Sequence, residues 1–317
     1  MRFSVIIPLY NKAPYVAKAI GSVLSQTFPD YELVIVDDGS RDDSAAIAAR
    51  VIEGNASCRL LKQENEGVSI ARNNGVAESQ GEYLCFLDAD DWWEPTFLEE
   101  MDRFIAEFSE AGIYGTNYTI FNDTKRKTRV ANIGVDKGFE KGYINYCQVY
   151  AKTMNMPLWT GAVCIPRKVF EEMQGFTKGI KLGEDFLLWI RIALKYKVAF
   201  MNKPLSYYNQ DVDVVNRGVK SDGYHPEEFM TFHFFQFAKE EKSNEELKIL
   251  LDRLRVYSLM RFRMENSAKE LVAEEIGKVD FNNVDSIYRF YYKAPYPLVS
   301  MYLKLVHGLS IIKEKLR

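Results

Sequence analysis

Residues 1–90 alternate between short apolar runs and segments with a helical period, and this alternation restricts the chain to few folds. An unbroken run of β-branched and apolar side chains is typical of a strand that is buried on both faces. Such runs recur at residues 3–9, 32–36, 60–61 and 83–87. Strands that alternate with helices predict an α/β fold, with a doubly wound, mostly parallel sheet flanked by helices.

The segments between the strands carry helix signals. Pro14 suits the first turn of a helix, and Ser40 with Asp43 resembles a capping box for a helix through Val51. Further elements are predicted downstream: helices at 67–78, 95–108, 167–173 and 184–196, strands at 113–121 and 159–165, and a hairpin or loop at 125–129. From Pro226 onward the pattern is nearly all helical, which predicts two domains, 1–222 and 223–317, with a boundary near Gly223.

Composition excludes several classes of protein. A chain of 317 residues with 47% hydrophobic and 27% charged residues has room for one large domain and a smaller one. Its net charge of −3 gives no general attraction to nucleic acid. The N-terminus enters a strand pattern at once, which argues against a signal peptide, and no long uncharged run predicts a membrane span. The four cysteines lack zinc-site spacing and suit a reducing compartment, so we expect a cytoplasmic protein.

Three polar loops directly follow apolar strands, at residues 8–11, 37–40 and 88–91. Ligands of open α/β sheets bind at the carboxyl ends of the strands, so these loops are the first candidates for a site. The last loop reads Asp88-Ala89-Asp90-Asp91. Crowded carboxylates repel one another unless a cation or solvent relieves them, and oxygen ligands of this kind suit Mg²⁺ or Mn²⁺. The alternative is that the acids only cap the helix that follows.

Four stretches follow one another in order: SVIIPLYNKAPYVAKAIGSVLSQTF, ELVIVDDGSRDDS, NEGVSIARNNGV and GEYLCFLDADDWWEP. With them the chain resembles the family 2 glycosyltransferases, closely over residues 3–110 and more loosely through WTGAVCIPRKVF and GEDFLLWIRI to residue 210. The resemblance implies a GT-A catalytic domain with a C-terminal helical extension. It also implies inverting transfer of a sugar from a nucleoside-diphosphate donor to a hydroxyl of a saccharide or lipid-linked acceptor. UDP is the nucleotide that we expect from the resemblance, and cell-surface polysaccharide synthesis is the expected setting.

The resemblance assigns residues to the nucleotide. Pro8, Tyr10 and Asn11 match the family's first nucleotide-binding loop, and Asp38 matches the carboxylate that reads the base. Arg72 matches a basic residue near the base and the phosphates. Two of these residues could instead have a purely structural role. The loop of Asp38 would be complete as a turn with a helix cap, and Arg72 could be an exposed helical residue paired with a nearby glutamate, Glu66 or Glu78.

The resemblance likewise assigns the metal site and the base. Asp88 and Asp90 match the DxD motif, which touches the ribose and holds a divalent cation, Mn²⁺ or Mg²⁺, on the diphosphate. Asp185 matches the general base that takes the proton of the acceptor hydroxyl. A helix N-terminus lowers the pKa of a carboxylate, whereas burial and neighbouring acids raise it, and the sequence leaves the outcome open.

The acceptor side is assigned to Trp159, Gly161 and Glu184. The indole of Trp159 could stack on a sugar ring or belong to the core. The chain departs from the family beyond residue 205, because no His lies between Leu205 and Tyr224. Asp211, Asp213 or Arg217 could take the place of that His, so the third protein ligand of the ion is left open.

The tail, residues 295–317, is basic and amphipathic. It could lie at the inner face of the plasma membrane, or its apolar face could dock on the chain itself or form a homodimer. Rival functions remain. A sugar-phosphate nucleotidyltransferase or a nicotinamide oxidoreductase would need a glycine-rich loop after the first strand, where this chain reads PLYNKAP. A non-catalytic sugar- or nucleotide-binding protein on the same fold is the third alternative.

Overall fold

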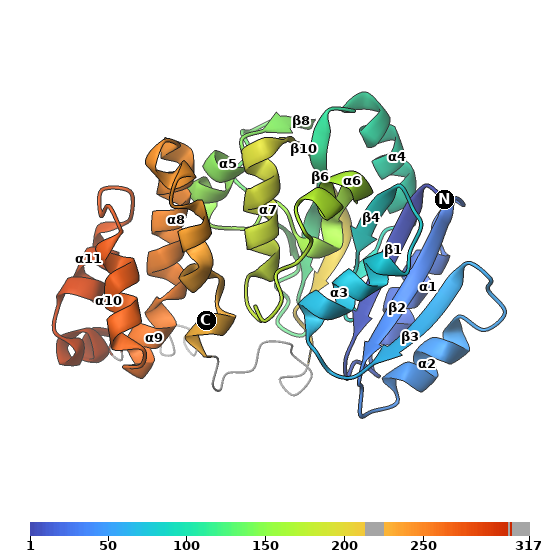
Figure 1. Cartoon of the computed structure of the whole chain (residues 1–317), viewed down its shortest axis with the longest axis horizontal. Coiled ribbons are helices and arrows are strands. Elements are labelled where there is room, and N and C mark those ends of the chain that lie inside the picture. The colour runs from blue at the N-terminus through green and yellow to red at the C-terminus, as the bar shows by residue number, and fades with distance from the viewer. Residues whose placement is uncertain (213–224, 304, 306–317) are drawn as a thin grey trace. The chain divides into compact units, whose positions relative to one another are not determined.

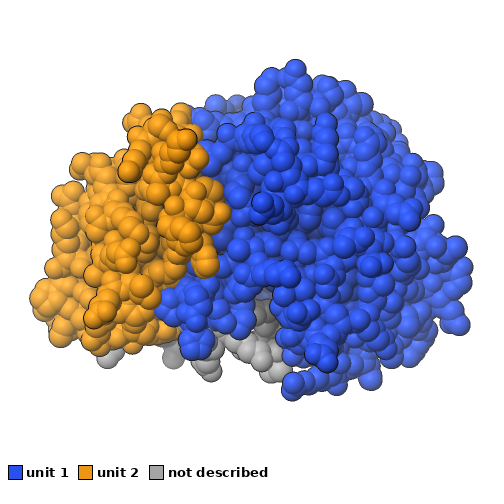
Figure 2. Space-filling view, in the orientation of Figure 1, with its two compact units in different colours: residues 1–230 blue, residues 231–317 orange. Residues whose placement is uncertain are grey.

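The computed structural model describes residues 1–212, 225–303 and 305. The chain divides into two compact units, Met1–Met230 and Thr231–Arg317, which Figure 2 colours separately. The boundary predicted near Gly223 lies outside the described residues and stays a prediction. Within the described part, no helix is both long and apolar enough to cross a membrane.

A sheet with parallel strands on one side forms the centre of the first unit (Figure 1). These strands lie in the order β3, β2, β1, β4, and they are β1 (Phe3–Leu9), β2 (Tyr31–Asp38), β3 (Cys58–Gln63) and β4 (Tyr83–Phe86). The predicted α/β architecture with parallel βαβ units is therefore confirmed.

The sheet continues from β4 into a mixed part. Its path runs through β9 (Val163–Pro166), β6 (Ala111–Phe121) and β10 (Lys197–Asn209) to β5 (Trp92–Trp93), while β7 (Arg129–Val130) pairs with β6 and β8 (Lys141–Ile144) with β10. Strand β9 is antiparallel to both neighbours, whereas β6 and β10 are parallel to each other. The sequence did not predict β10. A polar Asn-Lys-Pro segment interrupts its apolar pattern, and the strand register shifts between Met201 and Pro204.

Helices cover both faces of this sheet (Figure 1). They are α1 (Val16–Leu24), α2 (Ser44–Val51), α3 (Val68–Ala77), α4 (Phe97–Glu107), α5 (Tyr146–Thr153), α6 (Arg167–Glu172) and α7 (Glu184–Lys195). Successive side chains of β1 point to opposite faces. Val5 and Ile7 belong to the core that includes the apolar residues of α1 and α4, whereas Ile6 faces α3.

A glycine lets α3 lie close to the sheet. A Cβ atom at Gly75 would stand only 2.6 Å from Cγ2 of Ile6, so any other residue would push the helix away from β1. On the same face Phe86, which pairs with Ile6 in register, contacts Phe170 of α6 and Phe176 at ring-centroid distances of 5.7 and 5.1 Å. This close packing fixes α3 over the strand ends.

Two local predictions were wrong. Ser40 does not cap a helix: α2 begins at Ser44, Asp43 occupies the cap position, and no side-chain cap bond is formed there. The strand predicted at 159–165 begins only at Val163, because Thr160–Ala162 form a 3₁₀ turn. In both places side chains bond to other loops, and these long-range contacts override the local pattern.

The second unit is helical, as predicted. A 3₁₀ segment, Met230–Phe237, begins at the last residue of the first unit and leads into the second. The further elements are a 3₁₀ turn at Glu240–Lys242, α8 (Glu245–Ser258), α9 (Met260–Glu265), α10 (Lys269–Gly277) and α11 (Ser286–Lys293). Residues 296–303 are also helical. The predicted membrane-surface or docking role of the tail falls largely on residues outside the described part.

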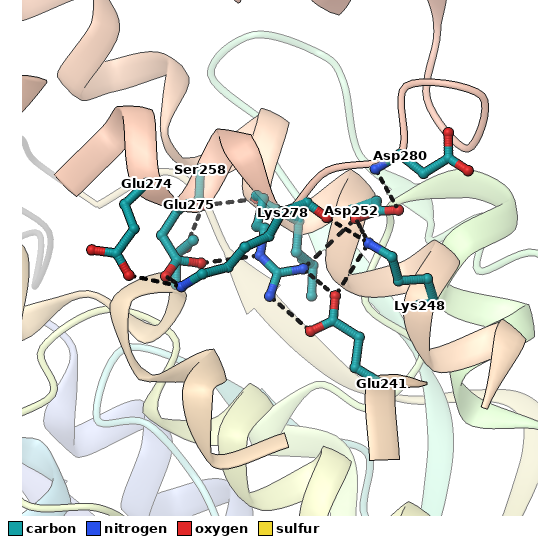
Figure 3. Close-up of polar contacts among 11 residues, drawn as sticks. Glu241, Lys248, Asp252, Ser258, Glu274, Glu275, Lys278 and Asp280 are labelled. Carbon is teal, nitrogen blue, oxygen red and sulfur yellow. Dashed lines mark hydrogen bonds and ion pairs between the residues drawn. The ribbon is translucent and has the colours of Figure 1, made fainter. Parts of the chain in front are cut away.

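A buried ion network joins the helices of this unit, and Figure 3 shows its polar contacts. Arg255 of α8 is 1% exposed and donates to both oxygens of Glu241, at 2.5 and 2.9 Å, and to Glu275 of α10 at 3.0 Å. Lys248 pairs with the fully buried Asp252. Burial of several carboxylates is tolerable only with such partners, because an unpaired buried charge is strongly destabilising.

Replacing Arg255 by Met should lower the free energy of unfolding by about 3–5 kcal/mol, because Glu241 and Glu275 lose their buried counter-charge. Chemical denaturation of the whole chain measures this loss. The matched control is Arg261→Met, which breaks a more exposed pair with Glu265 and should cost less than about 1 kcal/mol. Equal losses in the two variants would contradict a central role for Arg255.

Candidate active site

The loops after β1 and β2 are tied to each other. Asn11 has a left-handed backbone (φ 50°), which asparagine tolerates better than most residues. Its backbone N–H donates to Oγ of Ser40 at 3.1 Å, and its side-chain Oδ1 accepts from the N–H of Arg41 at 2.8 Å. The next N–H, of Lys12, donates to Oγ of Ser44 at 2.7 Å. Two of the predicted ligand loops therefore form one rigid rim.

Asp38 is buried at the end of β2 and accepts hydrogen bonds from four groups. The donors are the side chains of Gln63 and Asn65 and the backbone N–H groups of Glu66 and Gly67, at 2.8 to 3.2 Å. These bonds tie the segment that leads into α3 to the end of β2. The sequence did not reveal this role. Base reading by Asp38 remains a prediction.

Arg72 of α3 connects two acidic loops. Its Nη2 donates to Oδ1 of Asp88 and its Nη1 to Oε1 of Glu184, both at 2.7 Å. The side chain is nearly buried and also lies over the ring of Phe176, 5.1 Å from its centroid. Burial opposes the charge, but the two carboxylates outweigh it and raise the pKa of the guanidinium. The alternative of an exposed Arg72 paired with Glu66 or Glu78 is thus wrong.

Lys12 is a site residue that the sequence did not reveal. Its Nζ lies 2.5 Å from Oδ2 of Asp90, although the two residues are 78 positions apart. Burial raises the pKa of Asp90 and Lys12 opposes that rise, while Asp88 adds to it. The first two carboxylates of the DADD loop therefore each face a cation, one from α3 and one from the loop after β1.

Asp91, the remaining carboxylate of the loop, has a structural contact on each oxygen. Oδ2 accepts from the indole N–H of Trp159 at 3.0 Å, and Oδ1 accepts from the backbone N–H of Asn209 at 2.8 Å. It is buried, and burial together with Asp90 and Asp88 raises its pKa well above the usual range. Asp91 joins the DADD loop to the end of β10 and to the segment before β9.

Glu184 and Asp185 open α7, both buried. The helix follows Gly183, whose φ of 82° favours glycine. Asp185 accepts from the Thr160 hydroxyl at 2.8 Å and from the N–H of Phe186 at 2.9 Å. Burial raises the pKa of Asp185, although these two hydrogen bonds act to lower it. Burial and the neighbouring charge of Asp185 raise the pKa of Glu184 to about 7, although Arg72 acts to lower it. Of the effects that act on Asp185, burial is the largest, and it raises the pKa.

The acceptor-side residues lie next to these acids. Trp159 is partly exposed, and its ring centroid is 4.1 Å from that of Tyr208 and 5.7 Å from that of Tyr118. The carbonyl of Gly161 accepts from the indole N–H of Trp93 at 2.6 Å. A Cβ at Gly161 would stand 3.1 Å from Nε1 of Trp159, so the glycine leaves room for that ring. Trp159 is thus held at its edge, and part of its ring remains accessible.

The other predicted residues have less defined positions. Pro8 is partly buried in β1, and Tyr10 is 40% exposed beside the rim. Asp211 accepts from the N–H groups of Asp123 and Thr124, which places it on a loop. Asp213 and Arg217 lie outside the described residues.

The acids of the DADD loop fit a divalent ion that is shared with a substrate. Within the described residues, no group of three or more His, Cys, Asp or Glu side chains could enclose a metal. The side chains of Asp88 and Asp90 remain 26% and 18% exposed. Mg²⁺ commonly takes only one or two carboxylates and completes its shell with water and substrate phosphates. Two partly exposed carboxylates with a basic neighbour each are suited to that arrangement.

A family model described as glycosyl transferase family 2 matches residues 4–173, which is more than half of the chain. The chain belongs to this family. Glycosyltransferase GlyA of Streptococcus pneumoniae is 34% identical over 215 residues, which cover 65% of this chain and 30% of GlyA. A putative glycosyltransferase EpsH of Bacillus subtilis is 34% identical over 122 residues, which cover 38% of this chain and 35% of EpsH. The chain thus spans about a third of the length of such relatives.

Solved structures of low sequence identity share the fold. S. aureus TarS 1–349 in complex with UDP-GlcNAc has a TM-score of 0.75 at 19% identity, covering 95% of this chain and 90% of that one. Mannosyltransferase PcManGT from Pyrobaculum calidifontis, in complex with GDP-Man and Mn²⁺, has a TM-score of 0.55 at 18% identity, covering 98% and 80%. The family 2 resemblance and the GT-A fold with C-terminal helices are thereby confirmed.

Replacing Asp185 by Asn should stabilise this family 2 protein at neutral and alkaline pH. The folded state raises the pKa of Asp185 above its ordinary value, so wild-type stability falls as the carboxyl ionises with rising pH. The variant avoids that loss. We expect similar melting temperatures at about pH 3.5, below the ordinary pKa of 3.8, and a higher one for the variant at about pH 8. Asp136→Asn, at an exposed acid, is the control. A variant that is less stable at both pH values would contradict the burial effect.

Proposed function

We propose that this chain is an inverting, metal-dependent glycosyltransferase. It moves a sugar from a nucleoside-diphosphate donor, for which we propose a UDP-sugar, to a hydroxyl of a saccharide or lipid-linked acceptor. The observation that carries the proposal is the position of Arg72, which bonds to Asp88 of the DADD loop and to Glu184, the neighbour of Asp185. This link supports a single site shared by the loop assigned to the donor and the residue assigned to the acceptor.

On the donor side, the rim formed by Asn11 and Ser40 lies at the carboxyl ends of β1 and β2, where α/β sheets bind ligands. Asp88 and Asp90 would hold the divalent ion. When bound, this ion would neutralise the negative charge that grows on the departing nucleoside diphosphate. Arg72 and Lys12 add fixed positive charge beside the same loop, which favours an anionic donor at this end of the sheet.

On the acceptor side, Asp185 would take the proton of the attacking hydroxyl. A base works best when its pKa is close to the working pH, and burial moves the pKa of Asp185 upward in that direction. The Thr160 hydroxyl donates to Oδ2 and so fixes the orientation of the carboxylate. No second carboxylate is needed as a covalent nucleophile, and a single displacement inverts the anomeric carbon, by analogy with glycosidases.

The partly exposed ring of Trp159 is suited to the apolar face of an acceptor sugar. Asp91 and Tyr208 hold its edge and one face, so the ring enters the site in a fixed orientation. Similarity to TarS and PcManGT, whose structures contain UDP-GlcNAc, GDP-Man and Mn²⁺, supports a nucleotide-sugar donor and a divalent ion. Cell-surface polysaccharide synthesis at the cytoplasmic side of the membrane is the setting that we propose.

A panel of nucleotide sugars with Mn²⁺ tests the activity, with release of the nucleoside diphosphate as the readout. We expect one or a few donors to be used, and Asp185→Asn to slow release by about 10²–10⁴-fold, which is the usual contribution of a general base. UDP affinity in the presence of Mn²⁺ should change little, because Asp185 is assigned to the acceptor.

The control for this experiment is Asp136→Asn, which should behave as wild type. Loss of UDP binding in the Asp185 variant would show that its role is misassigned. Binding of UDP without turnover of any donor, even with saccharide acceptors added, would favour the non-catalytic binding protein instead.

A further inference from the structure

Lys12 occupies an unusual position for a lysine. Its backbone carbonyl accepts from the N–H groups of Tyr15 and Val16, at 2.9 and 3.0 Å, so the residue lies in the turn that leads into the N-terminus of α1. Its own N–H is fixed by Ser44. The side chain is only 12% exposed and extends to Asp90. The loop thus delivers an ammonium group to the carboxylate that is assigned to the metal ion.

Two general tendencies oppose this placement. Lysines are almost never buried unless they are paired, and the dipole of a helix disfavours a cation at its N-terminus. The attraction of the DADD loop must offset both. At the separation of 2.5 Å between Lys12 and Asp90, the ion pair supplies that attraction, and Asp88 adds a second negative charge nearby.

The two cations of the site differ in how firmly they are held. Arg72 is clamped between Asp88 and Glu184 by a planar group and is nearly buried. Lys12 carries a point charge on a flexible four-carbon stem, and its side chain is 12% exposed against 4% for Arg72. Of the two, Lys12 is the one that can exchange partners while its backbone stays in place.

We propose that Lys12 is a resident counter-ion of Asp90, which a divalent ion must displace and which then pairs with the donor diphosphate. This inference rests on the proposed function. A metal ion alone would push the ammonium away from Asp90 and leave two positive groups side by side. A diphosphate supplies new oxygens for the displaced ammonium. Metal and nucleotide binding are therefore coupled through Lys12, each strengthening the other.

Isothermal titration of Mn²⁺ and of UDP tests this coupling without any measurement of turnover. For wild type we expect saturating UDP to strengthen Mn²⁺ binding at least about fivefold. In Lys12→Met, Mn²⁺ alone should bind about five- to tenfold more tightly, because its competitor is gone. UDP should still strengthen that binding, because its phosphates complete the shell of the ion, but by a smaller factor than in wild type, and UDP with Mn²⁺ should bind more weakly than to wild type.

Two variants serve as controls. Lys12→Arg keeps the charge and should retain the coupling, and Lys62→Met removes an exposed charge of β3 and should match wild type. If Lys12→Met binds Mn²⁺ no more tightly than Lys62→Met, or keeps the full coupling to UDP, the inference is overturned. If wild type binds no UDP even with Mn²⁺, the proposed function itself fails, and that outcome is distinct from the first.

Discussion

The site depends on one buried guanidinium. Arg72 lies between Asp88 and Glu184, and without it two carboxylates would face each other in a poorly solvated space. Burial of charge is costly, so such a group persists only where its partners are well placed. The pairs connect α3, the end of β4 and the start of α7, which come from distant parts of the chain. An arrangement that brings these acids together also brings the donor loop beside the residue assigned as base.

The surrounding structure fixes where that guanidinium lies. Gly75 allows α3 to approach β1, and the four donors around Asp38 fix the segment from which α3 starts. Asp91 performs a similar task on the other side of the loop, because it holds Trp159 and the end of β10. Acidic residues of this site therefore divide between two tasks. Asp88 and Asp90 stay partly exposed, and Asp38 and Asp91 accept hydrogen bonds that hold the loops.

Much of this could be predicted from the sequence. Parallel strands with polar loops at their ends follow from the alternation of apolar runs, and the loops at Asp38 and Asp88 follow from the sheet rule. Long-range contacts could not be predicted. No local signal indicates that Lys12 reaches Asp90, or that Asp91 bonds to Trp159, because those partners lie 78 and 68 residues away. Strand β10 was missed for a related reason: its neighbours on the sheet stabilise it despite a polar interruption.

A double-mutant cycle of Arg72→Met and Glu184→Gln tests most directly whether the two acidic loops form one site. The affinity of UDP in the presence of Mn²⁺ is measured for wild type, both single variants and the double variant. Residues in direct contact are coupled by about 0.5–3 kcal/mol, and we expect the effects of this pair on UDP affinity to deviate from additivity by at least about 0.5 kcal/mol. Effects that simply add would contradict the account, because the loop of Asp88 would then bind the donor independently of the helix that carries Asp185.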